Sequence, residues 1–213
     1  ASSVTEDHVA AADFWDSAMD LDEYLGQMTQ HHDLFIKRIF EAEISDADRD
    51  SFGVEPLRFL ALTEDFCTDS AQFLPPIAKL AQELPHVDLR FLRRDEHRDL
   101  ADNYRRRDGY QAIPVIIALD ERGNELGFLI ERPQRVYDEL AAETRRFAKE
   151  HPEMDGVNRM YDRMPHNTKV AVRENSERFR DENQEQWSRW LLDDLAEIVS
   201  TGIERRKRQG AMV

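Results

Sequence analysis

The feature that most constrains the fold is the stretch from Leu57 to Ser70, where an apolar run is followed by a short loop and a helical pattern. Residues 57–62 are almost wholly apolar, which is typical of a central parallel strand that is buried on both faces. From Ser70 onward the apolar residues recur at helical spacing. The one cysteine of the chain, Cys67, lies at the junction. The sequence therefore predicts a strand–loop–helix unit with a thiol at the start of the helix.

Further landmarks follow in order along the chain. Pro75 comes shortly after the cysteine, and the Ile113-Pro114 dipeptide opens an apolar run that ends in a turn around Gly123. Together with the segment Cys67-Thr68-Asp69-Ser70, these features resemble the thioredoxin superfamily. Members of that superfamily have Cys-x-x-Cys at the start of this helix, a proline that kinks the helix, and a cis proline before an antiparallel hairpin. The resemblance covers about residues 57–150. It implies an α/β, thioredoxin-like fold, a mixed sheet flanked by helices, with helical N- and C-terminal extensions.

The resemblance also implies a role for each residue of the motif. In two-cysteine relatives the first thiolate attacks a substrate disulfide, and the second cysteine resolves the mixed disulfide. Cys67 is therefore the expected catalytic nucleophile, followed by the motif residues Thr68, Asp69 and Ser70. A serine hydroxyl cannot resolve a mixed disulfide, so the expected chemistry is monothiol. Ala61 stands where relatives keep a buried aspartate that serves the second cysteine, which agrees with the loss of that cysteine.

The residues next to Cys67 bear on its acidity and on its cofactor. Glutaredoxin-like relatives carry a basic residue just before the motif to meet glutathione, whereas this chain has Glu64 and Asp65. This argues against glutathione, and no cofactor is expected. The helix terminus is expected to lower the pKa of Cys67 below that of a free thiol. The acidic neighbours Glu64, Asp65 and Asp69 are expected to hold that pKa above the value of a typical family nucleophile.

Binding does not require a reactive thiol. In relatives the residue before the cis proline offers backbone hydrogen bonds to an extended peptide, which implies a substrate-binding groove formed by Phe66, Ile113 and Pro114. The leading hypothesis is a monothiol thiol–disulfide redox protein with a protein thiol, disulfide or peptide as its partner. The alternative is a non-catalytic binding module that uses this groove or the helix carrying Trp187 and Trp190. The sequence leaves open whether the protein is an enzyme and identifies no substrate.

Composition narrows the remaining function classes. The chain has 29 Lys and Arg against 44 Asp and Glu, and this formal net charge of -15 argues against nucleic acid and anionic membranes as partners. A single cysteine excludes an internal disulfide and fits a reducing compartment. The apolar run over residues 115–119 is too short to span a bilayer, and residues 1–4 show no signal peptide. A cytoplasmic protein is expected. His31 and His32 lack matching ligands nearby, so no metal site is expected.

The periodicity predicts the elements of a central domain over residues 57–150. After the first strand we expect a helix over 70–84, bent by Pro75 and Pro76, and a half-buried strand over 87–92 that runs parallel to the first strand near an edge. A polar helix over 96–107 directs Leu100 and Tyr104 inward. An antiparallel hairpin over 113–119 and 125–130 and a closing helix over 134–149 complete the domain.

Both flanks are predicted to be helical extensions. The N-terminal extension, residues 1–56, comprises a helix opened by Asp13, a helix over about 21–43 and a linker over 45–56. The C-terminal extension, residues 151–213, contains an unassigned stretch over 156–169 and a helix over about 175–208. Apolar residues recur along that helix at spacings of three and four, from Trp187 to Ile203. This stripe is expected to pack on the central domain, with a homodimer through the C-terminal helix as the alternative.

Overall fold

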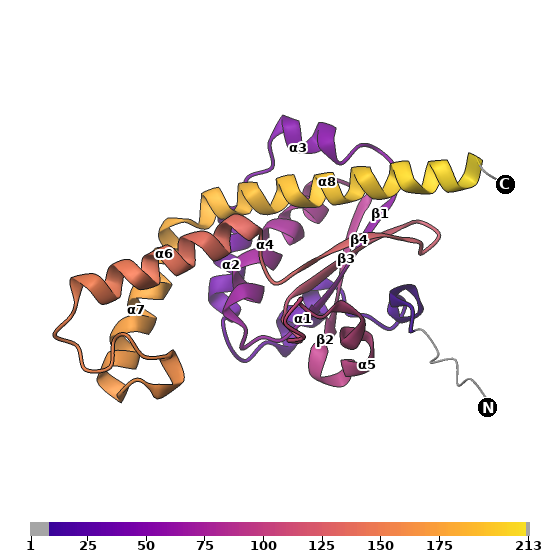
Figure 1. Ribbon diagram of the computed structural model, residues 1–213. Helices are drawn as coiled ribbons and strands as arrows, with labels where there is room; N and C mark the ends of the chain where they lie inside the picture. Colours follow the sequence, from indigo (N-terminus) through magenta and orange to yellow (C-terminus); the bar gives the residue numbers. More distant parts are fainter. Residues whose placement is uncertain (1–8, 212–213) are drawn as a thin grey trace, which may run out of the picture. The chain divides into compact units, whose positions relative to one another are not determined.

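The computed structural model describes residues 9–211 (Figure 1). The described chain separates into two compact units: unit 1 combines the part up to Arg132 with the part from Leu191 onward, and unit 2 covers residues 133–190. The three-part domain division expected from the sequence, with boundaries after residues 56 and 150, stays a prediction. None of the helices between residues 9 and 211 combines the length and the apolar character that a bilayer crossing needs.

Unit 1 is built on a mixed sheet in the order β2-β1-β3-β4. Its strands are β1 (Leu57–Thr63), β2 (Val87–Arg93), β3 (Val115–Asp120) and β4 (Glu125–Ile130). β2 is parallel to β1, β3 is antiparallel to β1, and β4 is antiparallel to β3. The predicted strands are thus confirmed, including the central place of the apolar run and the edge position of the alternating run.

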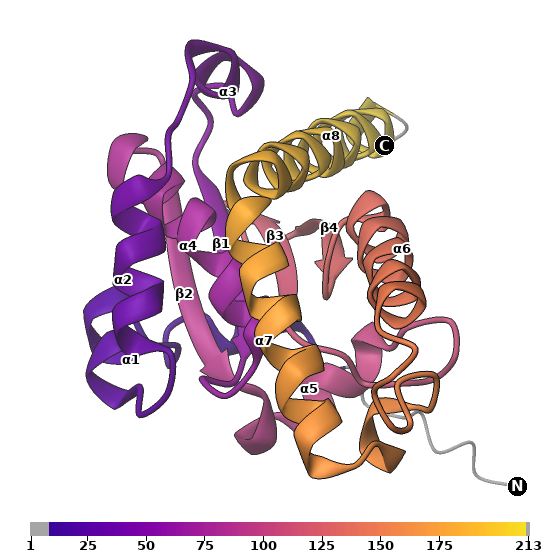
Figure 2. The ribbon, with the colours of Figure 1, turned by 90° about the vertical axis from the view of Figure 1, so that its left-hand side faces the viewer.

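One face of the sheet is covered by α4 (Thr68–Glu83), which contacts β2 and α2 (His32–Glu41) (Figure 2). Pro75 lies inside α4. Because its ring nitrogen carries no hydrogen, it cannot donate the helical hydrogen bond to the carbonyl of Ala71, one turn earlier. The buried side chain of Arg38, on α2, donates to that carbonyl at 2.9 Å between Nη1 and O. The charged side chain replaces the helical hydrogen bond that the proline removes, and it ties α2 to α4.

The opposite face carries a second cluster of buried residues. The short helix η1 (Ala11–Phe14) packs with Leu60 and Leu62 of β1 and with the segment after β2. That segment comprises η2 (Arg94–Glu96), α5 (Arg98–Ala101) and η3 (Asp102–Tyr104). The polar helix expected over 96–107 is therefore too long, although Leu100 and Tyr104 point into the core as predicted. The carboxylate of Asp102 accepts hydrogen bonds from Arg105 and Gln111, which draw the chain into a loop.

The N-terminal extension differs from its predicted helices. The helix expected from Asp13 is only the single turn η1, and a capping box at Asp20 instead opens α1 (Leu21–Gln27). The helix expected over 21–43 is interrupted between α1 and α2, where His31 adopts a left-handed conformation with φ 58°. The linker contains α3 (Asp46–Ser51), which a second capping box at Ser45 opens.

Unit 2 contains α6 (Gln134–Glu150), η4 (Tyr161–Arg163), α7 (His166–Glu182) and the start of α8 (Gln184–Ala211). The helix expected over 175–208 is thus two helices, which separate at Asn183. Trp187 is completely buried, meets Phe179 edge-to-face and donates its indole N–H to Glu139 at 2.7 Å. The tryptophan therefore belongs to a core, as its place in the stripe predicts.

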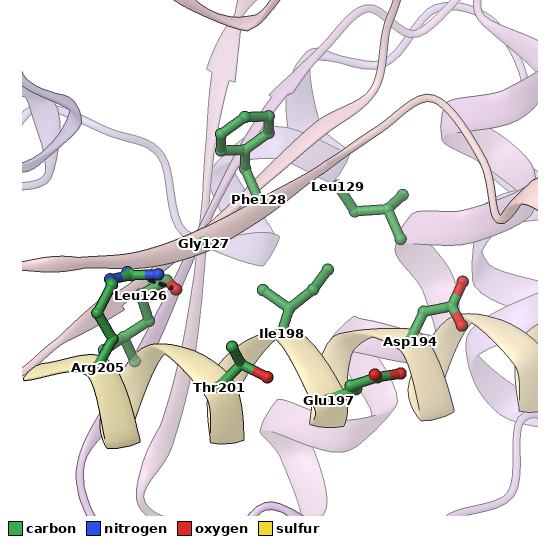
Figure 3. Close-up of a pocket in the computed structure, with 9 residues that line it drawn as sticks. All are labelled: Leu126, Gly127, Phe128, Leu129, Asp194, Glu197, Ile198, Thr201 and Arg205. Carbon is green, nitrogen blue, oxygen red and sulfur yellow. Dashed lines mark hydrogen bonds between the residues drawn. The ribbon is translucent and has the colours of Figure 1, made fainter.

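The C-terminal part of α8 returns to unit 1 and packs against β4 (Figure 3). Gly202 lies so close to β4 that a Cβ atom there would stand 2.2 Å from the carbonyl oxygen of Leu126. Arg205 donates to the carbonyls of Glu125 and Leu126, so α8 also satisfies backbone groups of this edge strand. Leu195 and Val199 are buried in unit 1. The homodimer expected as the alternative use of the stripe stays a prediction.

Candidate thiol site

Cys67 is the N-cap residue of α4, at the end of the loop that follows β1. Its backbone is extended, and its Sγ accepts a hydrogen bond from the backbone N–H of Ser70 at 3.4 Å. A thiol sulfur thus occupies the position where a serine or aspartate oxygen usually caps a helix. The side chain is partly exposed, and Cys67 is a free thiol. The local geometry agrees with the strand–loop–helix unit predicted from the sequence.

The structure brings Ile113 and Pro114 next to this thiol. The peptide bond between them is cis, and the thiol of Cys67 donates to the carbonyl of Ile113 at 3.5 Å between Sγ and O. The carbonyl of Pro114 accepts a hydrogen bond of 2.7 Å from the backbone N–H of Glu131. Phe66, the residue before the cysteine, is 48% exposed. Ile113 and Pro114 are themselves buried, so the exposed part of the predicted groove is Phe66 beside the partly exposed thiol.

The other motif residues have different environments. Thr68 is exposed at the first position of α4, whereas Asp69 and Ser70 are buried. The Ser70 hydroxyl makes no regular hydrogen bond within the described structure. The Ser70 side chain nevertheless lowers the pKa of the Cys67 thiol. A hydroxyl therefore occupies the place where two-cysteine relatives have the resolving thiol.

Burial raises the pKa of the Cys67 thiol above its ordinary value, and the charge of Asp69 raises it further. Interactions with Ser70 and with the backbone N–H groups at the start of α4 lower the pKa, but they do not outweigh burial. The sequence-based expectation that the pKa would fall below that of a free thiol is therefore wrong. Loss of solvent around the sulfur has a larger effect than the helix terminus.

The two acidic residues before the motif are held by other segments. Glu64 is buried, accepts a 2.8 Å hydrogen bond from the backbone N–H of Asp95 and lies 3.4 Å from the guanidinium of Arg93. Asp65 Oδ2 accepts hydrogen bonds from the backbone N–H groups of Thr29 and Gln30, in the turn between α1 and α2. These contacts explain the interruption of the predicted helix over 21–43. Asp69 is the acidic residue with the largest charge effect on Cys67.

Sequence reasoning missed an ion-pair network beside the thiol. Arg132 Nη2 lies 2.8 Å from Asp69 Oδ2 and 2.9 Å from Glu131 Oε1, and Glu131 Oε2 lies 2.9 Å from Arg106. Glu131 is buried and has a left-handed backbone with φ 66°, which is uncommon for a residue other than glycine. No short-range pattern marks these residues, because 63 positions separate Asp69 from Arg132.

Residues 9–211 contain no group of three histidine, cysteine, aspartate or glutamate side chains that could hold a metal ion. A cavity of about 130 Å³ lies between α1 and the loop after β1, lined by Tyr24, Asp65 and Arg93 among others. A groove of about 460 Å³ lies between β4 and α8 and includes none of the predicted site residues (Figure 3).

The comparison with protein families identifies the chain. The family model described as thioredoxin matches residues 18–145, more than half of the sequence. The protein belongs to the thioredoxin family. The predicted superfamily membership and the predicted thioredoxin-like α/β fold are thereby confirmed. No curated protein matches the chain.

Solved structures share the thioredoxin-like fold with this chain. A protein of unknown function from Pseudomonas aeruginosa, solved at 1.5 Å, has a TM-score of 0.60 and 17% identity over 91% of this chain and 98% of its own. An HIV epitope scaffold has a TM-score of 0.52 and 22% identity over 61% of this chain and 82% of its own. At such identities the likeness concerns the fold alone. The first of these matches extends beyond the residues covered by the thioredoxin family model.

Proposed function

We propose that this thioredoxin family protein is a monothiol thiol–disulfide redox protein in which Cys67 is the nucleophile. The observation that supports this function is the position of the thiol, which caps α4 and lies 3.5 Å from the Ile113 carbonyl beside a cis proline bond. Ser70 occupies the second position of the motif and offers no thiol for resolution. One cysteine that must stay reduced suits a reducing compartment such as the cytoplasm.

The proposed reaction is a single thiol–disulfide exchange. Cys67 loses its proton to solvent, and the thiolate sulfur attacks one sulfur of a partner's disulfide. A new disulfide forms between Cys67 and that sulfur, the partner's disulfide breaks, and the other partner sulfur leaves as a thiolate that takes up a proton. A second, external thiol then attacks the mixed disulfide, releases Cys67 as a thiol and forms a disulfide with the sulfur that was attacked.

The proposed partner is a protein or peptide disulfide rather than glutathione disulfide. Phe66 presents an exposed apolar side chain beside the thiol, which suits an extended peptide with an apolar residue next to its cysteine. The positions just before the motif carry Glu64 and Asp65, which are held by hydrogen bonds to other segments. These carboxylates offer no cation for a carboxylate of glutathione.

The reduced protein should form a mixed disulfide that persists. We expect Cys67 to form a disulfide with one half of an insulin-derived peptide disulfide, at one peptide per chain. This mixed disulfide should persist because no second thiol in the chain can displace the attached peptide. Intact-mass spectrometry after removal of excess peptide measures the adduct over hours, and addition of dithiothreitol should release it within minutes. The Cys67→Ser variant is the matched control and should form no adduct. Spontaneous loss of the adduct from the purified protein, with no thiol added, would contradict the monothiol mechanism.

A specific observation favours a second candidate function. Burial and Asp69 raise the pKa of Cys67, which reduces the thiolate fraction available for attack relative to a free cysteine. A non-catalytic binding module would use the groove predicted at Phe66, Ile113 and Pro114 without any exchange reaction. Under this candidate function, the Cys67→Ser variant would bind a partner peptide as tightly as the native chain. Under the redox function, capture of the partner disulfide would require Cys67.

A further inference from the structure

The groove between β4 and α8 is bounded by the open edge of the sheet. Residues 126–129 of β4 line one wall, and one face of α8 lines the other, from Asp194 to Arg205. Because successive side chains of a strand point to opposite faces, four consecutive lining residues show that the backbone edge of β4 takes part in the wall. β4 is the outer strand of its sheet, and no strand between residues 9 and 211 pairs with its second edge.

The ladder between β3 and β4 shows which backbone groups point to this edge. Opposite residues of an antiparallel pair alternate between those that exchange hydrogen bonds and those that do not. The Glu131 N–H donates to the Pro114 carbonyl, so this pair is a bonded position. Counted along the register from there, the position at Leu129 is bonded, and the positions at Ile130 and Phe128 are not. The N–H and C=O of Phe128 therefore point away from β3, toward the open edge.

The outward carbonyls on either side of Phe128 already have partners. The carbonyl of Ile130 accepts a 2.8 Å hydrogen bond from the backbone N–H of Arg132, and the carbonyl of Leu126 accepts one of 3.1 Å from Arg205. Among the described residues, no backbone hydrogen bond outside the ladder reaches the N–H or C=O of Phe128. An added strand that pairs with Phe128 would satisfy both groups.

The two faces of β4 offer different surroundings to the side chains of such a strand. A Cβ atom at Gly127 would stand 2.6 Å from Ile198, which points from α8 toward the strand (Figure 3). The Gly127 face therefore looks toward α8. Phe128 projects from the opposite face, is 42% exposed, and has its ring centre 5.0 Å from that of Tyr104. An apolar side chain on this second face would cover part of the exposed ring.

The charges along the α8 wall favour a basic partner. The carboxylates of Asp194 and Glu197 line this wall, and Glu197 is exposed. Arg205, the cation of the lining, donates to the carbonyls of Glu125 and Leu126. The chain as a whole has a formal net charge of -15, which draws basic partners toward it. Side chains that point from an added strand toward α8 should therefore carry positive charge.

We propose that the edge of β4 binds an extended segment of a partner protein, with a basic–apolar–basic pattern, as an antiparallel strand. The apolar residue lies opposite Phe128, and its N–H and C=O exchange hydrogen bonds with the C=O and N–H of Phe128. Opposite residues share a face, so the apolar side chain covers the Phe128 ring, and the two basic neighbours point toward Asp194 and Glu197. The groove includes none of the thiol-site residues, so this binding does not require Cys67.

The test is an NMR titration of the nitrogen-15-labelled protein with the capped peptide Thr-Lys-Val-Lys-Thr. The amide signals of Phe128 and Glu197 should shift with peptide concentration, and the amide signal of Cys67 should not. The peptide Thr-Glu-Val-Glu-Thr should bind at least about tenfold more weakly, because like charges meet on the α8 side. Methylation of the valine nitrogen should weaken binding about fivefold, since it removes a donor to β4. Methylation of the second lysine backbone nitrogen, which points away from β4, should have little effect.

Variants of the protein locate the contact. Phe128→Pro removes the outward N–H, a change that an edge strand can accept. It should bind the lysine peptide about fivefold more weakly than Phe128→Ala, which loses the same ring but keeps the N–H. Glu197→Gln should weaken binding about threefold, as expected for an exposed charge pair. Cys67→Ser should leave the affinity unchanged, which separates this site from the thiol.

Several results would overturn the proposal. One is equal affinity of Phe128→Pro and Phe128→Ala, and another is equal affinity of the lysine and glutamate peptides. Peptide-induced shifts confined to Cys67 and Ile113 would assign the peptide to the thiol site instead. Shifts at Phe128 that grow with protein concentration, without peptide, would show that a second copy of the chain occupies the edge. If Phe128→Pro does not fold, the two methylated peptides decide the question with the native chain.

Discussion

The Ser70→Cys variant is expected to reduce insulin disulfides catalytically in the presence of a thioredoxin reductase, whereas the native chain shows no turnover under the same conditions. The substitution places a second thiol at the position whose backbone N–H is 3.4 Å from the Cys67 sulfur. That thiol can attack the mixed disulfide from within the chain, so release no longer requires an external thiol. The turbidity of precipitating insulin chains measures the turnover.

Two control variants accompany this experiment. Ser70→Ala removes the hydroxyl without adding a thiol and should remain inactive. Cys67→Ser combined with Ser70→Cys retains one thiol at the other position and should also remain inactive. Turnover by the native chain without added thiol would show that Ser70 does not limit the chemistry. If Ser70→Cys shows no turnover although mass spectrometry demonstrates its intramolecular disulfide, the groove predicted at Phe66 and Ile113 does not bind insulin chains.

The second large effect concerns the packing of α8 on β4. Valine in place of Gly202 is expected to destabilise the protein by about 3 kcal/mol, because an added side chain overpacks a closed contact. A Cβ atom at this position would stand 2.2 Å from the Leu126 carbonyl oxygen and 2.6 Å from its Cβ atom. A backbone carbonyl cannot move aside as the end of a flexible side chain can. The midpoint of urea unfolding, followed by circular dichroism, measures the change.

Gly210 offers a matched control on the same helix. It also lies in α8, but an added Cβ there would meet nothing within 4 Å. Gly210→Val should change the stability by less than about 0.5 kcal/mol, since valine has a slightly better helix propensity than glycine. Equal unfolding midpoints for the two variants would show that the contact between α8 and β4 does not contribute to stability.

The parts of the fold that the sequence predicted depend on short-range patterns. The apolar run of β1, the alternation of β2 and the turn at Gly123 are each visible within a few residues. The break between α1 and α2 is different, because it depends on hydrogen bonds to Asp65 from a distant part of the chain. The periodicity after β4 predicted the helix at 134–149, which is α6. It did not predict that the helix packed on β4 within unit 1 would be α8, which is distant in the sequence.

The candidate site shows the same limit. The placement of Cys67 near Ile113 followed from a resemblance that spans the motif and the dipeptide. The pKa of Cys67 was predicted in the wrong direction because the extent of burial cannot be read from a single sequence. Arg132 also escaped notice, since its ion pair with Asp69 forms only when α4 and the end of β4 meet. Burial and long-range ion pairs are the properties that needed the structure.

The central claim is that Cys67 is a reactive thiol in the folded protein, and the most direct test is its labelling by iodoacetamide at pH 8.5 with and without urea. We predict that the folded protein takes up one label per chain at a rate proportional to the reagent concentration. The unfolded protein should react faster, because burial and Asp69 no longer raise the pKa of the thiol. Labelling of the folded protein at a rate that is independent of reagent concentration, and therefore limited by unfolding, would contradict the claim.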